Sequence, residues 1–490
     1  MAIRHHIRAM SRDTSGAILV FWAVSLAVIL GIVALSFDFG RIASTQSELQ
    51  SYADEVALAA AAELDGKSTS ITRATNAAAA LFTDTQSFGS GSRTLSSSSY
   101  TLDFYSTLPS SDTANLAAGV TTNPAEAIYA RVVVTPKTVA FTFGKAFYSL
   151  SGITPVTAQV GAVAVAGFTE YACDITPMMF CIPSPTFDAD NPATVGDMIR
   201  LRAGGQGAAW GPGNFGFLEP TTLALDSTGN CAGISGTGPM LRCVLGAVGS
   251  ITQCFPIRGV NTEPGQKVGI TNDSLNTRFD MWSGAMSSEK NNPIYAPAPN
   301  VIKGIEPNSG GACNWNNSVP TSNTAALPRD DCFPGCAPYG NGTWTTGRSA
   351  AVTGYVAKNY GATDPHPTAL TRYQYYLAEI AAHGGAASTA AILTGRAETG
   401  RRMCSSQQSP DPERRVIIAA GIDCTANPIN GRTTGVPVHQ FVKLFITEPV
   451  VSNGGSGTAL DIYAEIISSA GGGGSSSTAG IFRDVVQLYR

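Results

Sequence analysis

The sequence has 490 residues, of which 13% are charged, and its net charge at neutral pH is −4. This small acidic balance argues against binding to nucleic acid or an anionic surface through an excess of Lys and Arg. The apolar share of 43% is too high, and the charged share too low, for a disordered chain. We therefore expect folded domains, and the length suggests two or three of them.

The first predicted element is an uncharged run of 21 residues from Ala17 to Phe37. As a helix it is about 31 Å long, which is enough to cross the hydrocarbon core of a membrane. Only a helix does this alone, because lipid provides no partner for unpaired backbone groups. We predict a transmembrane helix over residues 14–37, preceded by a short basic tail over residues 1–13.

Three arginines of that tail, Arg4, Arg8 and Arg12, precede the uncharged run. The positive-inside rule predicts a cytoplasmic N-terminus in the inner (cell) membrane, with everything after the helix outside the cytoplasm. A cleaved secretory signal is the alternative, since residues 34–36 resemble a small-residue cleavage site. The uncharged run exceeds the usual apolar core of a signal peptide, so we favour an uncleaved single-pass anchor.

The helical pattern continues beyond the membrane. Residues 38–65 contain no proline and are rich in Ala, Leu, Gln and Glu. Their apolar side chains recur every seven residues, and two more follow a neighbouring line; together they form a seam of Ile42, Leu49, Tyr52, Val56 and Ala59. We predict one helix of about 50 residues, half in the membrane and half outside with one apolar seam.

Strand-like segments follow a second predicted helix at residues 71–83. Alternating apolar and β-branched residues predict strands at residues 100–105, 127–135, 139–143 and 156–166, punctuated by Pro136 and several glycines. A small antiparallel sheet of these strands would bury one face against the helix seam.

Several of these segments together resemble a known family. The anchor, the motif Asp38-Phe39-Gly40-Arg41 and the helical segment Leu49–Ala61 resemble the N-terminal domain of the TadE/TadG-like Flp pilus-assembly proteins. The resemblance implies a pilin-like helix-plus-sheet domain over residues 38–168 and a role in a tight-adherence (Flp, type IVb) pilus. It continues through residues 131–167 and, near the end of the chain, through residues 414–420, 423–424, 441–449, 462–465 and 484–490.

The details favour a TadG-like over a TadE-like protein. Prepilin-like members of the wider pilin group are cut after a glycine and carry Glu at the fifth position of the mature chain. Here the fifth residue after Gly16 is Phe21. The Asp-x-Ser-x-Ser metal motif that some TadG-like proteins carry is not found in the sequence. The resemblance implies other Tad pilus-assembly proteins or pseudopilins as partners of the N-terminal helix, besides the inner-membrane lipid.

Residues 169–490 are predicted to form a β-rich periplasmic domain. Strands are expected at residues 416–422, 441–447, 462–467 and 485–489, and together they would form its core sheet. The predicted fold class is therefore α+β, with a transmembrane, pilin-like helix and a small antiparallel sheet followed by a β-rich, disulfide-stapled domain.

All ten cysteines lie in this last region, and an even number in an exported segment predicts disulfides. Zinc is the alternative, since Cys332 and Cys336 are spaced closely enough to be half of a metal site. However, no second close Cys pair or nearby His pair completes four ligands. The spacing leaves the pairing open. The disulfide candidates are Cys173, Cys181, Cys231, Cys243, Cys254, Cys313, Cys332, Cys336, Cys404 and Cys424.

No pattern of residues predicts catalysis, a cofactor or a metal site. Asp461 and Glu465 alternate on a predicted strand, but at about 13 Å their spacing is too wide for a glycosidase pair, and we expect a solvated strand face. No Gly-x-Ser-x-Gly elbow occurs between a strand and a helix. The glycine-rich residues 195–218 lack the spacing of a phosphate-binding loop.

Two functional hypotheses remain from the sequence. The first is a non-catalytic, membrane-anchored structural component of Flp pilus assembly that exports a large folded domain. The second is a membrane-anchored adhesive or ligand-binding module that pilus assembly does not need. An enzyme is the least supported class.

Overall fold

The computed structural model describes residues 17–80, 84–108, 119–145, 152, 157–173, 175–203, 210–219, 230–248, 254–256, 259–263, 267–307, 318–453, 459–470 and 482–489. The basic tail and Gly16 therefore lie outside the described residues. The chain divides into two compact units. The first comprises residues 1–169 and 484–490, and the second comprises residues 170–483.

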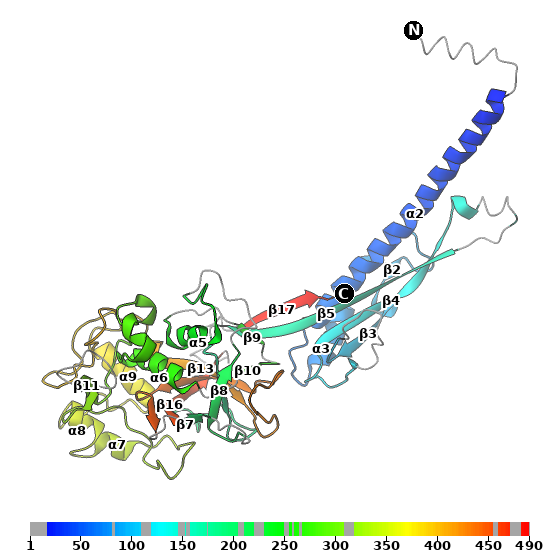
Figure 1. Cartoon of the computed structure of the whole chain (residues 1–490). Helices are drawn as coiled ribbons and strands as arrows, with labels where there is room; N and C mark the ends of the chain where they lie inside the picture. Colours follow the sequence, from blue (N-terminus) through cyan, green and yellow to red (C-terminus); the bar gives the residue numbers. More distant parts are fainter. Residues whose placement is uncertain are drawn as a thin grey trace, which may run out of the picture. The chain divides into compact units, whose positions relative to one another are not determined.

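The first unit is built on one long helix, α2 (Ala17–Ala61, 45 residues), followed by α3 (Ser70–Ala80). The absence of proline lets α2 run without a break. Figure 1 shows α2 lying along a sheet that contains β3 (Tyr100–Tyr105), β4 (Tyr129–Ala140) and β5 (Thr157–Cys173). These three strands pair antiparallel, as predicted, and they lie in sequence order. A short hairpin of β1 (Asp84–Thr85) and β2 (Thr94–Leu95) and a 3-10 turn, η1 (Ser97–Ser99), precede the sheet.

Strand β4 corrects one prediction, because the two segments expected on either side of Pro136 form a single strand. Its pairing with β3 stops at Val134, so the proline's missing N–H costs no bond to that neighbour. Towards β5 the register shifts between Val134 and Lys137, which is the irregularity that a proline inside a strand requires.

The last strand, β17 (Phe482–Leu488), corrects another prediction. It lies beside β5 at the edge of the first unit's sheet and not in the core sheet of the second unit. Just beyond it, the Tyr489 backbone N–H donates to the Val165 carbonyl at 2.8 Å, and the Tyr489 ring meets Tyr129 edge to face at 5.2 Å. Gly167 makes room for both rings, since a Cβ there would lie within 2.9 Å of each.

The second unit contains a mixed sheet whose strands follow the order β10-β8-β6-β13-β14-β16-β15, with β7 joined to β16 and β8. The pairs β6–β13 and β7–β8 are parallel and the others are antiparallel. The strands are β6 (Met178–Cys181), β7 (Met198–Ala203), β8 (Asn214–Leu218), β10 (Thr262–Glu263), β13 (Val416–Ile422), β14 (Gln440–Ile446), β15 (Val451–Asn453) and β16 (Ala459–Ser469). Two smaller pairings involve β11 (Ile305–Pro307) with β12 (Ser318–Pro320), and β9 (Cys254–Pro256) with the end of β5.

Helices cover both faces of this sheet. Along β14, Leu444 and Ile446 enter the core that also holds residues of α5 and α6, whereas Phe445 points to the other face and contacts α9 through Tyr376. The helices are α5 (Thr237–Gly246), α6 (Val268–Asn276), α7 (Thr345–Ser349), α8 (Tyr355–Asn359) and α9 (Arg372–Ala382), with 3-10 turns η3 (Thr277–Phe279), η4 (Gly284–Glu289), η5 (Pro293–Tyr295) and η7 (Pro412–Arg415).

The architecture is the predicted α+β fold, with a long apolar helix and small sheet followed by a β-rich unit that contains disulfides. Strands β3 and β13 begin and end at the predicted residues.

Candidate functional site: the anchor helix and its junction with the sheet

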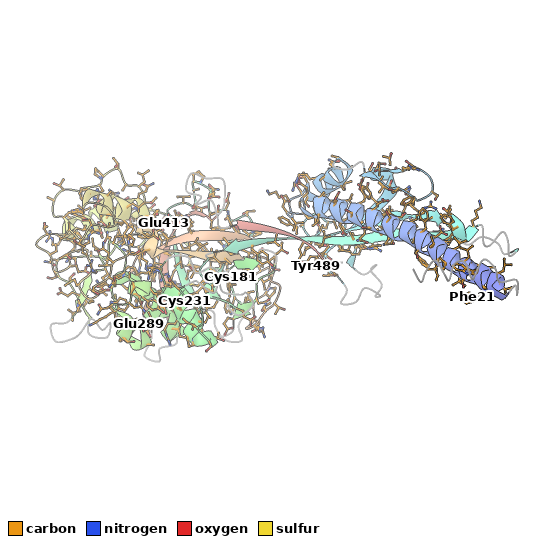
Figure 2. All side chains as sticks on the ribbon, turned by 90° about the horizontal axis from the view of Figure 1, so that it is seen from above. Phe21, Cys181, Cys231, Glu289, Glu413 and Tyr489 are labelled. Carbon is orange, nitrogen blue, oxygen red and sulfur yellow. A yellow bond between two sulfur atoms is a disulfide. The ribbon has the colours of Figure 1, made fainter. Side chains whose placement is uncertain are left out.

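The first half of α2 exposes apolar side chains on all sides. Phe21, Leu30 and Ile32 are 70%, 58% and 60% exposed, and no described residue of the run from Leu19 to Phe37 is buried. Figure 2 shows Phe21 at this end of the helix, with side chains projecting outward. A continuous apolar surface of this size is not stable in water. The helix is long and apolar enough to cross a membrane. These features support single-pass membrane anchoring.

Asp38 is the first charged residue after the apolar run, and it is 2% exposed. Its carboxylate accepts backbone N–H bonds from Thr142 at 2.8 Å, Phe143 at 3.4 Å and Gly144 at 2.7 Å. These charge-assisted bonds hold the segment after β4 against the helix. We call the contacts of Asp38 and Arg41 with residues 140–144 the junction.

Arg41 completes the junction from one helical turn further on. Its guanidinium donates to the Ala140 carbonyl at 3.1 Å and to the Thr142 hydroxyl, and it lies 5.1 Å from the centre of the Phe88 ring. Residues three apart lie on the same face of a helix, so both charged groups of the Asp38-Phe39-Gly40-Arg41 motif reach the same loop. The junction therefore fixes the sheet to α2 where the uncharged run ends.

We expect Asp38→Ala to lower the stability of the first unit by about 2 kcal/mol, because three backbone donors lose a charged acceptor. Thermal unfolding and limited proteolysis of the full chain in detergent measure the effect. Asp103→Ala is the matched control, since its carboxylate is 46% exposed and lies 3.9 Å from Arg131. Equal melting temperatures for the two variants would contradict the structural role of Asp38.

Two glutamines beyond the junction attach α2 to the edge of β5. Gln46 donates to the Gly161 carbonyl and Gln50 to the Val163 carbonyl, both at 3.0 Å. Residues four apart on a helix and two apart on a strand are both spaced by about 6 Å, which lets two glutamines meet alternate carbonyls. The next carbonyl on this edge, Val165, accepts from Tyr489. The four-residue spacing of the two glutamines is the only signal in the sequence for this role, and it did not lead to a prediction.

The seam lies inside the first unit. Leu49, Tyr52 and Val56 are fully buried, Ile42 packs against the same core while partly exposed, and Ala59 is half-buried. The sheet and α3 cover the seam. The seam is therefore covered by the chain itself, whereas the first half of α2 is exposed.

Tyr52 carries a hydroxyl that is buried without a hydrogen-bond partner among the described residues. Burying an unpaired hydroxyl is unfavourable, so we expect Tyr52→Phe to raise the free energy of unfolding by about 1 kcal/mol. Thermal unfolding in detergent tests this, with Val56→Ala as a control that must destabilise by creating a cavity. A lower melting temperature for Tyr52→Phe would show that the hydroxyl has a partner.

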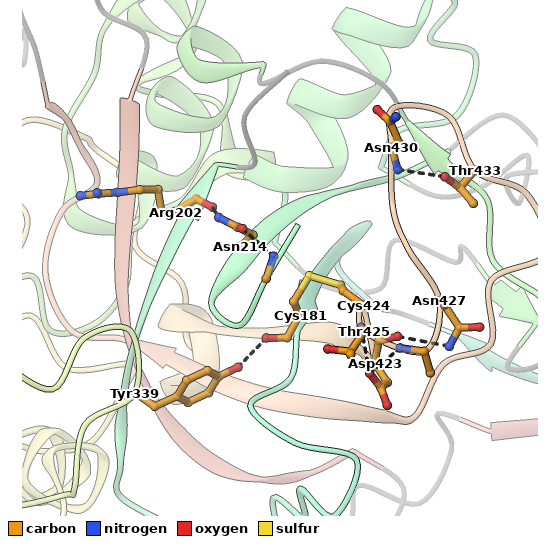
Figure 3. Close-up of a disulfide and its surroundings, with 12 residues drawn as sticks. Cys181, Arg202, Asn214, Tyr339, Asp423, Cys424, Thr425, Asn427, Asn430 and Thr433 are labelled. Atoms are coloured by element: carbon orange, nitrogen blue, oxygen red, sulfur yellow. Dashed lines mark hydrogen bonds between the residues drawn. A yellow bond between two sulfur atoms is a disulfide. The ribbon is translucent and has the colours of Figure 1, made fainter. Parts of the chain in front are cut away.

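Six of the ten candidate cysteines form three disulfides in the described part of the chain: Cys181–Cys424, Cys231–Cys243 and Cys332–Cys336. Figure 3 shows the first of these, with the Tyr339 hydroxyl directed at the Cys181 carbonyl, 2.6 Å away.

The structure describes three of the other four cysteines. Cys404 is also disulfide-bonded. Cys173 and Cys254 occupy opposite positions in the backbone pairing of β5 with β9, and Cys313 lies outside the described residues. The described residues contain no group of three His, Cys, Asp or Glu placed to hold a metal ion.

The prediction that one face of β16 is solvated is wrong. Asp461 is 4% exposed and Glu465 is 1% exposed. Arg202 binds Asp461 with two bonds of 2.7 and 2.8 Å, and Arg329 stacks 3.6 Å from the centre of the Tyr463 ring between the two carboxylates. Alternating polar and apolar residues indicate a solvated strand face only when one face of the sheet is exposed to water. Here other parts of the chain cover both faces of the sheet at β16.

Glu465 belongs to a buried charge cluster at the N-terminus of α9. Its carboxylate accepts the backbone N–H groups of Arg372 at 2.8 Å and Tyr373 at 2.9 Å, and the Arg372 guanidinium lies 3.2 Å away. The same guanidinium pairs with Asp330. Burial raises the pKa of Glu465 above its ordinary value, while the charge of Arg372 opposes the rise. The cluster locks α9 onto the sheet.

A second buried carboxylate, Glu379, lies on the same helix. It accepts hydrogen bonds from Tyr355, Tyr360 and Asn300 at 2.7, 2.6 and 2.6 Å. Burial raises its pKa to about 7, although these bonds favour the charged form. Because both its oxygens are bound by the protein's own donors, Glu379 fixes the packing of α8 and α9.

Comparison with known proteins bears on the first unit. Residues 16–63 match the family model Tad, described as "Putative Flp pilus-assembly TadE/G-like". We call these residues the TadE/G-like domain, after the family that they resemble. It contains the anchor helix, both charged residues of the junction and both glutamines that bind β5. No curated protein matches the chain, and no solved structure matches it.

The TadE/G-like domain confirms the predicted resemblance and relates the chain to Flp pilus assembly. With the anchor helix, it supports association with a membrane and with the Tad system. The matched residues end at Glu63, so the resemblance of the later segments and the choice of TadG-like over TadE-like remain predictions.

Proposed function

We propose that the chain is a non-catalytic structural component of Flp pilus assembly, anchored in the inner membrane and holding its second unit in the periplasm. The observation that carries the proposal is the coincidence of the TadE/G-like domain with an exposed apolar helix that the junction ties to a sheet. In this arrangement α2 crosses the membrane, and the junction holds the sheet of the first unit at a fixed position on the helix.

Two features support the proposed orientation, one before the membrane-spanning part of α2 and one after it. Arg4, Arg8 and Arg12 precede it, and such residues remain on the cytoplasmic side. The disulfides of the second unit form and persist in an oxidising compartment such as the periplasm. A periplasm-dependent reporter enzyme inserted in the exposed turn at Lys67 tests the orientation, and an inactive reporter would refute it.

The proposed non-catalytic role is supported by the state of the buried charged groups. Glu379, Glu465 and Asp461 are each held by donors of the protein itself. A catalytic carboxylate must reach a proton of its substrate, and the protein donors already compete for the oxygens of these three groups. Partners in the proposed role are other Tad pilus-assembly proteins or pseudopilins, which would contact the exposed half of α2 within the membrane.

Deleting the gene and imaging surface filaments tests the proposal. We expect filaments to be lost and to return when the wild-type chain is supplied. A chain with Leu26→Arg and Val33→Arg should fail to restore them, because each arginine at the centre of a membrane helix costs about 2.5–3.5 kcal/mol. A chain with Leu26→Ala and Val33→Ala is the matched control and should restore them.

Unchanged filaments in the deletion strain would contradict the proposal and favour the alternative, a membrane-anchored adhesive or ligand-binding module. Cell attachment to surfaces, measured in the same strain, would then be the property that the deletion changes.

A further inference from the structure

The chain contains a second apolar surface beside the anchor. We propose that residues 141–145, the segment that follows β4, form a second membrane contact seated at the boundary between lipid headgroups and acyl chains. This inference rests on the membrane anchoring in the proposed function and adds to it a lipid-binding surface on the folded part of the first unit.

The segment lies beside the residue at which the uncharged run ends. Asp38 binds the backbone of residues 142–144, and the Phe143 ring meets the Phe37 ring edge to face at 5.3 Å. Phe37 is the last residue of the uncharged run. The segment therefore lies within about one helical turn, 5.4 Å, of the level at which the chain leaves the hydrocarbon core.

The surface of the segment and of the adjacent helix is aromatic and carries one lysine. Phe143 is 47% exposed, and Phe37 and Phe39 on the adjacent helix are 52% and 56% exposed. Lys145, two residues after Phe143, is also exposed. Exposed aromatic side chains next to a lysine are typical of elements at the membrane interface, where rings enter the acyl boundary and the ammonium group reaches the headgroup phosphates.

Lipid is the occupant that the position of this surface favours. The aromatic surface is continuous with the apolar surface of α2 through the contact between Phe37 and Phe143. Lipid that surrounds the helix up to Phe37 therefore also reaches Phe143. A helix held by lipid at one further point is restrained in depth and in rotation about its axis, which a lone helix is not.

The experiment places a fluorophore at the segment. The full chain carrying Phe143→Cys is labelled with an environment-sensitive dye and reconstituted into vesicles of phosphatidylcholine and phosphatidylglycerol with nitroxide-labelled lipids. Phe39→Cys provides the reference inside the interface. Val352→Cys provides the reference in water, because Val352 is an apolar side chain that is 77% exposed in the second unit. Unmodified chain corrects for any labelling of native cysteines, and Lys145→Cys provides a second position in the segment.

We expect the label at position 143 to be quenched about as strongly as the label at position 39 and several-fold more strongly than the label at position 352. Quenching at positions 143 and 145 equal to that at position 352 would overturn the inference and leave this surface for a protein partner. Strong quenching at position 39 alone would support the membrane anchoring and contradict the further inference. Absence of quenching at position 39 refutes the anchor itself.

Discussion

Replacing Arg372 by Met is expected to lower the free energy of unfolding of the second unit by about 3–5 kcal/mol, because it leaves buried carboxylates without their counter-charge. The Arg372 and Asp330 side chains are fully buried, and that of Glu465 is 1% exposed. Arg372 also donates to the Pro328 carbonyl at 2.6 Å and the Gly196 carbonyl at 3.3 Å. Methionine fills similar space but supplies none of these bonds.

Chemical denaturation of the full chain in detergent, followed by tryptophan fluorescence, measures this loss. The guanidinium of Arg372 lies 5.1 Å from the centre of the Trp344 ring, which provides a local probe. Arg432→Met is the matched control, because its side chain is 58% exposed and its ion pair with Glu219 contributes less than about 1 kcal/mol. Equal denaturation midpoints for the two variants would show that the cluster contributes no more than a surface ion pair.

Removing the disulfide Cys181–Cys424 is expected to cost more stability than removing Cys332–Cys336. The first bond joins residues 243 apart in the sequence and the second joins residues four apart. In the chain-entropy account the two bonds stabilise by about 5 and about 2 kcal/mol, since a longer closed loop removes more freedom from the unfolded chain. The first bond also fastens β6 beside β13, where Cys181 is aligned with Ile422.

The double variants Cys181→Ser/Cys424→Ser and Cys332→Ser/Cys336→Ser should be compared by thermal unfolding under the same oxidising conditions. We expect the first to melt clearly below the second. The reverse order would show that strain or residual structure in the unfolded chain, and not loop length, determines the contribution of these bonds.

Local sequence patterns determined much of the first unit. The uncharged run from residue 17 and the proline-free segment after it were sufficient to predict α2, because helix formation and membrane crossing depend on neighbouring residues alone. The buried positions Leu49, Tyr52 and Val56 followed from helical periodicity in the same way. Strands β3 and β13 were also delimited correctly from their β-branched and aromatic residues.

Long-range contacts determined the rest. The three bonds of Asp38 reach residues 104 to 106 positions away, and the Arg202–Asp461 pair spans 259 positions. The periodicity of a strand does not show that α9 and the preceding loops cover β16. Glu465 was therefore predicted to be exposed, although it is buried.

Tertiary contacts likewise determine which sheet β17 joins. Its apolar residues predicted a strand but not which sheet it joins. That choice depends on an unpaired edge of β5 and on the space that Gly167 leaves for Tyr129 and Tyr489. The sequence by itself therefore determined the long apolar helix and strands such as β3 and β13, since these depend on local composition and period. Only the tertiary structure decided which elements pair and which charged groups are buried, because both follow from contacts between residues distant in the chain.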